Sequence, residues 1–179
     1  MKIKILLVIL ILLCLLSCKE NKVEPKTLRD TVNLETAPDQ TSWDNDVIFV
    51  DSSFTKARLK AKRARVYEKR MQTVLDGGVY VEFYSRWTNK RTSHLTADMA
   101  EINDRTKDML ARGNVVVISD SSQTKVETQL LNWNNKTQMF YSTEFVKVTS
   151  PKEIIQGYGF ESDQNLDNYK IFRVSGERK

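Results

Sequence analysis

The 179-residue sequence predicts an all-β domain of antiparallel strands, built from a repeated hairpin and preceded by an export leader. Three observations support this prediction. A unit of about 31–36 residues recurs, its apolar residues alternate as in strands, and turn residues separate these segments with no long helical pattern. Repeats of this length indicate stacked supersecondary units, none of which buries its apolar face alone. We therefore expect a sandwich or barrel-like stack and no catalytic domain.

The clearest copies of the unit are Leu95–Ser119 and Val126–Ser150, which lie 31 residues apart. Identical or similar residues match at this offset: Asn103 with Asn134, Asp104 with Asn135, Arg105 with Lys136, Thr106 with Thr137, Val115 with Val146, Val117 with Val148 and Ser119 with Ser150. A fainter copy, 36 residues before the first, contributes Leu59, Ala61, Ala64, Val66, Gly77, Val79 and Val81.

Each copy carries the same irregularity in its apolar spacing. The inward candidates are spaced by three residues and then by two: Ala61, Ala64 and Val66; Ala97, Ala100 and Ile102; Thr128, Leu131 and Trp133. A strand alternates with period two, so one extra residue occupies the same place in each copy. We predict a β-bulge there, which bends the strand and increases its twist.

Residues 1–18 are typical of a lipoprotein signal peptide. Two lysines lie within Met1–Lys4, and the apolar run Ile5–Leu16 is shorter than the roughly 20 residues of a bilayer-spanning helix. Ser17 and Cys18 complete a lipobox-like sequence, where cleavage would leave Cys18 to be acylated. The alternative is an uncleaved signal anchor with an incidental cysteine. Either form places the rest of the chain outside the cytoplasm, and acylation would tether it to a membrane.

Residues 19–42 are polar, contain two prolines and lack periodicity, as expected of a flexible linker. The domain then occupies residues 43–179, and it opens at Trp43 with an apolar strand over Val47–Val50. Both cysteines of the chain lie in the leader. The domain therefore has no disulfide framework and no thiol site.

The segment Phe54–Met71 is compatible with two structures. Alternation of Ala57, Leu59 and Ala61 with basic residues favours a strand, whereas its Ala, Lys, Arg and Glu content permits a helix. The register with the later copies favours the strand. Its eight basic residues, from Lys56 to Arg70, either form a solvated sheet face or contact lipid phosphates, and the solvated face is the simpler interpretation.

Turn residues separate the later segments. We expect tight turns at Val74–Gly78 and at Arg112–Asn114, after which Val79–Phe83 continues as a strand. Asn103-Asp104 and Asn134-Asn135 should lie at hairpin tips, because Asn and Asp tolerate a left-handed backbone.

The sequence offers little for catalysis. His94 is the only histidine, so a triad or a His-rich metal site would depend on a single residue. There is no phosphate-binding glycine loop, HExxH motif or paired-cysteine motif. Without the two leader lysines, the net charge falls from +5 to about +3. A charge of this size is weak evidence for a polyanionic partner. We expect no enzyme activity, no cofactor, no metal site and no nucleic-acid partner.

The repeat resembles the OstA-like unit of the lipopolysaccharide-transport proteins LptA and LptC. The residues that carry the resemblance are Ala97-Asp98, Ala100, Ile102-Asn103, Thr106, Ala111 and Gly113-Asn114-Val115. The run Gly157–Asp163, followed by Leu166 to Ile171, is similar to the end of LptC chains. The order of anchor, linker and one domain also resembles LptC, and the resemblance covers about residues 43–175.

This resemblance implies a twisted antiparallel β-jellyroll, an open V-shaped sandwich whose apolar faces do not close fully on each other. It implies a lipid-anchored protein on the periplasmic side of the inner membrane. Such a protein receives lipopolysaccharide from the ABC exporter LptB/LptF/LptG and passes it to an LptA-like bridge by pairing of strand edges. The best-known LptC chains contact the exporter through a transmembrane helix. Here the apolar segment is short, so docking would depend on the domain.

Inward apolar residues are expected to line the path of the lipid. They are Val79, Val81, Ile102, Val115, Val117, Leu130, Trp133, Val146 and Val148. A simpler interpretation is that they only form a core. A second hypothesis for the whole protein follows from it: a structural cell-envelope lipoprotein whose β-domain binds another protein and carries no lipid. The two hypotheses differ in whether the interior opens.

Overall fold

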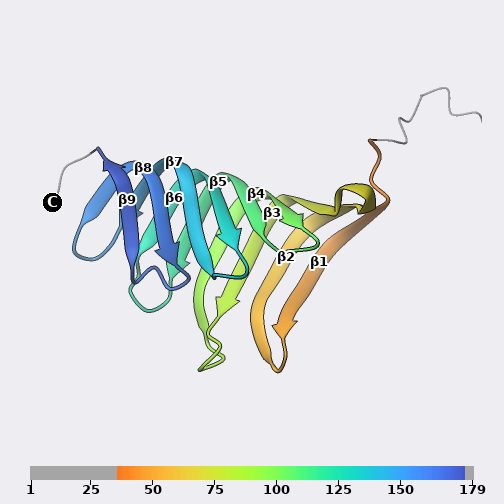
Figure 1. Cartoon of the computed structure of the whole chain (residues 1–179), viewed down its shortest axis with the longest axis horizontal. Helices are drawn as coiled ribbons and strands as arrows, with labels where there is room; N and C mark the ends of the chain where they lie inside the picture. The colour runs from red at the N-terminus through yellow and green to blue at the C-terminus, as the bar shows by residue number, and fades with distance from the viewer. Residues whose placement is uncertain (1–35, 176–179) are drawn as a thin grey trace, which may run out of the picture. The chain divides into compact units, whose positions relative to one another are not determined.

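The computed structural model describes residues 36–175, which form one antiparallel sheet of nine strands in chain order (Figure 1). The strands are β1 (Gln40–Asp51), β2 (Phe54–Tyr67), β3 (Gln72–Tyr84), β4 (Arg91–Asn103), β5 (Met109–Ser119), β6 (Lys125–Asn134), β7 (Met139–Thr149), β8 (Ile154–Asp163) and β9 (Tyr169–Val174). Each strand pairs with its sequence neighbours, so β1 and β9 are edges and the sheet is not closed. The all-β prediction is confirmed.

The repeated unit is a hairpin. The copies correspond to β2–β3, β4–β5 and β6–β7, and β8–β9 adds a further hairpin. The ambiguous segment Phe54–Met71 forms β2 and then a short 3-10 helix, η1 (Glu68–Arg70). Burial of Leu59, Ala61 and Ala64 against the core outweighs the helical propensity of the residues between them.

Strand β1 begins three residues before the expected start at Trp43 and spans 12 residues, far more than Val47–Val50. It pairs with β2 from Gln40 opposite Val66 to Asp51 opposite Phe54, with Asp44 unpaired in the ladder and a register shift between Phe49 and Val50. Nearly all of its side chains are exposed. Because they face solvent, its first residues are polar and carry no apolar alternation that would mark a strand.

A line of unpaired residues crosses the middle of the sheet, and we call it the corner column. Its members in β2 to β8 are Lys62, Gly77-Gly78, Asp98, Gly113-Asn114, Gln129, Thr143-Glu144 and Gly159. The even-numbered strands contribute one residue and the odd-numbered strands two, which makes a two-against-one bulge at each step. The ladder is therefore interrupted at the predicted places in β2, β4 and β6, but the extra residue of each bulge lies in the odd-numbered partner strand.

The predicted turns at Val74–Gly78 and Arg112–Asn114 are wrong. Both segments lie within strands, β3 and β5, and the chain does not reverse direction there. Gly77 and Gly113 have positive φ angles of 80° and 74°. A Cβ on Gly77 would lie 2.8 Å from the Cβ of Lys62, and one on Gly113 would collide with the carboxylate of Asp98. These glycines therefore make room for the single unpaired residue of the neighbouring strand and do not reverse the chain.

The corner column bends strands β2 to β8, so that the two halves of each strand lie in different layers. Layer A contains residues 57–61, 79–84, 91–97, 115–119, 125–128, 145–149 and 154–158. Layer B contains residues 63–67, 72–76, 99–103, 109–112, 130–134, 139–142, 160–163 and 169–171. Phe83 of layer A packs on Trp133 and Phe140 of layer B. Facing half-strands thus come from strands three or four apart in the sheet.

The hairpin tips lie where the sequence predicts, for a different reason. The side-chain oxygen of Asn103 accepts hydrogen bonds from the backbone N–H groups of residues 105 and 106, at 3.0 and 3.1 Å. Asn134 repeats this arrangement with residues 136 and 137. The left-handed residues are Lys107 and Gln138, with φ angles of 62° and 57°. Asparagine therefore serves as a side-chain acceptor that closes the turn.

We predict that Gly113→Ala destabilises the domain by more than about 1–2 kcal/mol, because the left-handed backbone and the collision with Asp98 both oppose a Cβ. Equilibrium denaturation in urea measures the loss. Truncating Asp98 to Ala in the same chain should remove the collision and return part of the stability. Gly78→Ala, which meets nothing within 4 Å, is the control for backbone strain alone. Equal losses for Gly113→Ala and Gly78→Ala would contradict the proposed packing.

Candidate functional site

The interior between the layers is one continuous hydrophobic core. Eight of the nine predicted lining residues are buried in it: Val79, Val81, Ile102, Val115, Val117, Trp133, Val146 and Val148. Together they come from β3, β4, β5, β6 and β7. The interior therefore presents apolar side chains from one end of the sheet toward the other.

Leu130 is the exception, and its assignment to the interior is wrong. It follows the unpaired Gln129, and a shift of one residue turns a side chain to the other face of a strand. Leu131 fills the interior position, with 1% of its surface exposed. The carbonyl of Leu130 accepts a hydrogen bond of 2.7 Å from the hydroxyl of Ser142, which satisfies a backbone group near the bulge.

Three aromatic rings join the two layers. The ring centroids of Phe83 and Trp133 lie 4.6 Å apart, those of Trp133 and Phe140 4.9 Å, and those of Phe83 and Phe140 5.2 Å. Such close, tilted packing stabilises the contact beyond the area it buries. Sequence reasoning missed Phe140. The repeat could have identified it, since it lies 31 residues after the buried Met109.

A small cavity of about 40 Å³ lies beside these rings. Its apolar wall includes Phe49, Leu59, Val81, Ile102 and Met109, and its polar rim includes Lys56, Lys107, Asn135, Gln138 and Gln164. A volume of this size holds only a few water molecules. The interior is therefore packed, and a larger apolar ligand would enter only if the layers separated.

One polar contact between the layers joins β2 to the β6–β7 turn. The ammonium group of Lys56 donates to the backbone oxygen and the side-chain oxygen of Asn135, at 3.2 and 3.0 Å. The two residues are 79 positions apart in the sequence. We call this contact the lysine clamp.

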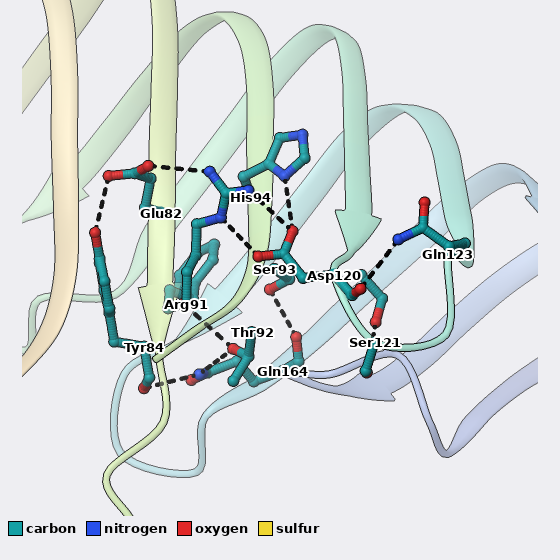
Figure 2. A network of polar contacts seen from close by, with 12 residues as sticks. Glu82, Tyr84, Arg91, Thr92, Ser93, His94, Asp120, Ser121, Gln123 and Gln164 are labelled. Atoms are coloured by element: carbon teal, nitrogen blue, oxygen red, sulfur yellow. Dashed lines mark hydrogen bonds and ion pairs between the residues drawn. The ribbon is translucent and has the colours of Figure 1, made fainter. Parts of the chain in front are cut away.

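A second contact, which we call the glutamine clamp, joins the β8–β9 loop to the end of the β3–β4 hairpin (Figure 2). The amide of Gln164 donates to the backbone oxygen of Tyr84 at 3.1 Å and to the hydroxyl of Thr92 at 2.8 Å. The buried hydroxyl of Ser93 donates to the backbone oxygen of Gln164 at 2.7 Å. Both clamps lie on the rim of the cavity, since Lys56 and Gln164 line it.

An ionic network adjoins the glutamine clamp (Figure 2). Arg91 donates to both carboxylate oxygens of Asp120, at 2.7 and 3.2 Å, and to Glu82 at 3.2 Å. The half-buried His94 places Nδ1 3.5 Å from Asp120. Within residues 36–175, no group of three or more His, Cys, Asp or Glu side chains is arranged to hold a metal ion.

The network shifts the ionisation of its carboxylates. The hydrogen bonds from Arg91 hold the pKa of Asp120 below its usual range. Burial raises the pKa of Glu82, but hydrogen bonds from Tyr84 and Arg91 outweigh burial, so the net pKa of Glu82 is lowered. Both groups therefore favour the charged form in the folded protein.

The basic segment of β2 forms ion pairs on the outer face of the sheet. Arg58 binds both carboxylate oxygens of Asp46, at 2.8 and 2.6 Å. Arg63 and Arg65 each approach Asp76 at 2.8 Å, and the hydrogen bond from Arg63 is the main cause of the lowered pKa of Asp76. This arrangement supports the interpretation as a solvated, charged sheet face.

The two edge strands differ in charge and both expose apolar side chains. Strand β1 carries three aspartates and no Lys or Arg, whereas β9 carries Lys170 and Arg173 and no acidic residue. The exposed apolar residues on these edges are Trp43, Val47, Ile48 and Val50 on β1, and Phe172 and Val174 on β9. Free backbone groups beside such side chains are suited to the addition of a strand from a partner.

The leader, including Cys18, lies outside the described residues. Among residues 36–175, no helix has the length and apolar character needed to cross a bilayer.

We predict that acid destabilises the domain through Asp76, Asp120 and Glu82. Their lowered pKa values contribute stability that is present above the unfolded-state pKa of about 4 and is lost as the pH falls through the lower folded-state values. Denaturation in urea at a series of pH values measures this loss. Asp76→Asn should make the loss smaller. Asp167→Asn is the control, since Asp167 forms no ion pair within residues 36–175, and equal curves for both variants would contradict the assignment.

We predict that Gln164→Ala lowers the free energy of unfolding by about 1–3 kcal/mol, because it leaves the backbone oxygen of Tyr84 and the hydroxyl of Thr92 without their partner. Thermal and urea denaturation measure the effect. Gln123→Ala is the matched control, since the amide of Gln123 makes one exposed hydrogen bond, to the backbone oxygen of Asp120. A loss no greater than that of the control would argue against the clamp.

Comparison with solved structures identifies the architecture. A crystal structure of LptH from Pseudomonas aeruginosa, described as the LptA homologous periplasmic component of the conserved lipopolysaccharide transport device, matches with a TM-score of 0.53. The match covers 65% of this chain and 82% of that chain, at 17% sequence identity. An LptA-like β-jellyroll is therefore the fold of the described domain, as predicted.

Comparison of sequences identifies the family. No curated protein sequence matches the chain. The family model described as "Lipopolysaccharide-assembly, LptC-related" matches residues 5–173, which is nearly the whole chain. The bulged hairpins, the continuous apolar interior and this match lead to the same conclusion: the chain belongs to the LptC-related family of lipopolysaccharide-assembly proteins.

Proposed function

We propose that this protein carries lipopolysaccharide across part of the periplasm, holding the acyl chains between layers A and B. Membership of the LptC-related family supports a role in lipopolysaccharide transport. The single observation that carries the proposal is the apolar interior, which is continuous across the strands of an unclosed sheet. Acyl chains are chemically equivalent to the side chains already packed there.

Loading requires the layers to separate, because the cavity holds only a few water molecules. The lysine and glutamine clamps are polar contacts at its rim, and each exchanges protein hydrogen bonds for hydrogen bonds to water when it opens. The net cost of such an exchange is about 1 kcal/mol per neutral hydrogen bond and about 1.5–3 kcal/mol for one from a charged group such as the Lys56 ammonium. The incoming acyl chains replace the interlayer contacts that are lost, so the open form is stabilised by its cargo.

The edges supply the partners in this proposal. Strand β1, with its exposed apolar and acidic residues, pairs with the exporter formed by LptB, LptF and LptG. Strand β9 pairs with an LptA-like bridge protein and passes the lipid on. Pairing at β9 extends the sheet, so that the apolar interior continues into the next domain.

The proposal also includes the location of the protein. Residues 1–18 act as a lipoprotein signal peptide, Cys18 carries the lipid anchor, the linker runs from residue 19 to residue 39, and the domain begins with β1 at Gln40. The anchor holds the domain on the periplasmic side of the inner membrane, within reach of the exporter.

The packed interior favours a second candidate function. A cavity of about 40 Å³ is also what a structural cell-envelope lipoprotein would have, if its β-domain bound another protein and carried no lipid. In that case the edges would still bind partners, but the interior would stay closed.

Site-specific photo-crosslinking distinguishes the two functions. We predict that a photoreactive amino acid at Val117, Val148 or Trp133 forms adducts with lipopolysaccharide in cells, since these side chains face the interior. The same group at Val116, which is next to Val117 on the opposite face of β5, should form few adducts. Adduct yield at Val117 should rise when Gln164→Ala weakens the glutamine clamp.

Absence of lipopolysaccharide adducts at all three interior positions, in a chain that still crosslinks to a protein through β9, would favour the structural lipoprotein. Adducts at Val116 and Val117 in equal yield would show contact with lipid on the outside of the sheet, and would contradict transport through the interior.

A further inference from the structure

Two strand ends form a projecting surface that the proposed path of the lipid does not use. One is the tip of the β1–β2 hairpin at Asp51–Phe54, and the other is the β3–β4 loop at Ser85–Lys90 (Figure 1). The side chain of Trp87 at this loop is 88% exposed. Its exposure exceeds that of every other large apolar residue in the described part of the chain.

Contacts hold these two ends together. The guanidinium carbon of Arg86 lies 5.7 Å from the ring centre of Phe54 and 5.6 Å from that of Trp87. Within the loop, the hydroxyl of Ser85 accepts hydrogen bonds from the N–H groups of Trp87 and Thr88, at 3.2 and 3.3 Å. The loop therefore presents Trp87 outward in a defined backbone conformation.

The charge of this surface is positive. Arg86 and Lys90 form no ion pair with any carboxylate in residues 36–175, in contrast to Arg91, which is paired with Asp120 and Glu82. The acidic residue at the β1–β2 tip, Asp51, is paired with Lys56: its carboxylate lies 3.9 Å from the ammonium group. We define the tip patch as Val50, Phe54, Arg86, Trp87 and Lys90.

We propose that the tip patch docks on the surface of a bilayer that contains anionic lipids, with Trp87 in the headgroup region. Tryptophan is enriched at membrane interfaces, where its ring is partly apolar and its N–H is hydrated. Unpaired basic residues beside it are attracted to anionic headgroups, and each strengthens binding about fivefold. Exposed Val50 adds apolar surface at the same end.

A bilayer fits the tip patch better than a protein does. A stable protein interface buries roughly 800 Å² per partner, whereas the tip patch is two narrow strand ends with one large exposed side chain. A protruding aromatic residue with cations at its base matches an interfacial membrane contact. The inference goes beyond the proposed function, because it requires neither lipid cargo nor edge pairing.

Fluorescence in reconstituted vesicles tests the inference. The full-length protein carrying Trp43→Phe is reconstituted into vesicles of phosphatidylcholine, with or without phosphatidylglycerol. In this chain Trp87 is the exposed indole, because Trp133 is buried. We expect lipids brominated near the headgroup to quench Trp87 emission in vesicles with phosphatidylglycerol, and aqueous iodide to lose its access to Trp87 there. High salt should reverse both effects.

Charge variants complete the test. The double variant Arg86→Ala, Lys90→Ala should lower the ratio of protein with a docked tip patch to protein with an undocked one about 30-fold, since each cation contributes about fivefold. Arg86→Lys with Lys90→Arg should retain docking. Lys170→Ala with Arg173→Ala removes the same charge from β9 and should have no effect.

Continued access of iodide to Trp87 in vesicles that retain the protein would overturn the inference, while leaving the anchor and transport proposals intact. Shielding of Trp87 that appears only when exporter proteins are reconstituted alongside would also overturn it, because the partner would then be a protein.

Discussion

The domain depends on the corner column, because this line of bulges converts one sheet into two facing layers. A nine-stranded antiparallel ladder without bulges would have one apolar face and nothing to cover it. The bulges bend strands β2 to β8 near their middles, so the apolar face folds onto itself and leaves water. Each bulge also constrains the position of the bulge in the neighbouring strand. Gly77 accommodates Lys62, and Gly113 accommodates Asp98, so the position of each bulge sets the register of the next strand.

This construction explains why the interior is apolar and the sheet is nevertheless open. Folding within each strand covers the core without any pairing between β1 and β9, and both edges therefore keep free backbone groups. A closed barrel would have a comparable core but no edges to extend. The polar clamps lie where the layers meet, at Lys56 and Gln164, and aromatic packing at Phe83 continues the contact inward. The contacts across the interior described above each involve a side chain, whereas backbone hydrogen bonds join the strands within a layer.

The repeat made much of this fold predictable from the sequence. The predictions that the structure contradicts failed for physical reasons. The spacing of three in β2, β4 and β6 revealed a bulge, because it breaks the period of two. The spacing of four in β3 and β5 preserves that period, so Gly77-Gly78 and Gly113-Asn114 were mistaken for turns. Leu130 was assigned to the interior, but the bulge shifts the alternation of side chains by one residue, so that Leu131 faces inward. The partners in the clamps are more than 70 positions apart, and no local pattern links Lys56 to Asn135.

The stagger between facing half-strands has a consequence for how the domain forms as the chain is synthesised. Lys56 contacts a residue 79 positions later, and Gln164 contacts residues 72 and 80 positions earlier. A chain delivered from its N-terminus therefore pairs β2 with β3 long before the covering half of β6 arrives. High contact order of this kind slows folding and leaves apolar surface open to aggregation while synthesis continues. The apolar face of the first hairpins therefore stays uncovered until the last third of the chain has been made.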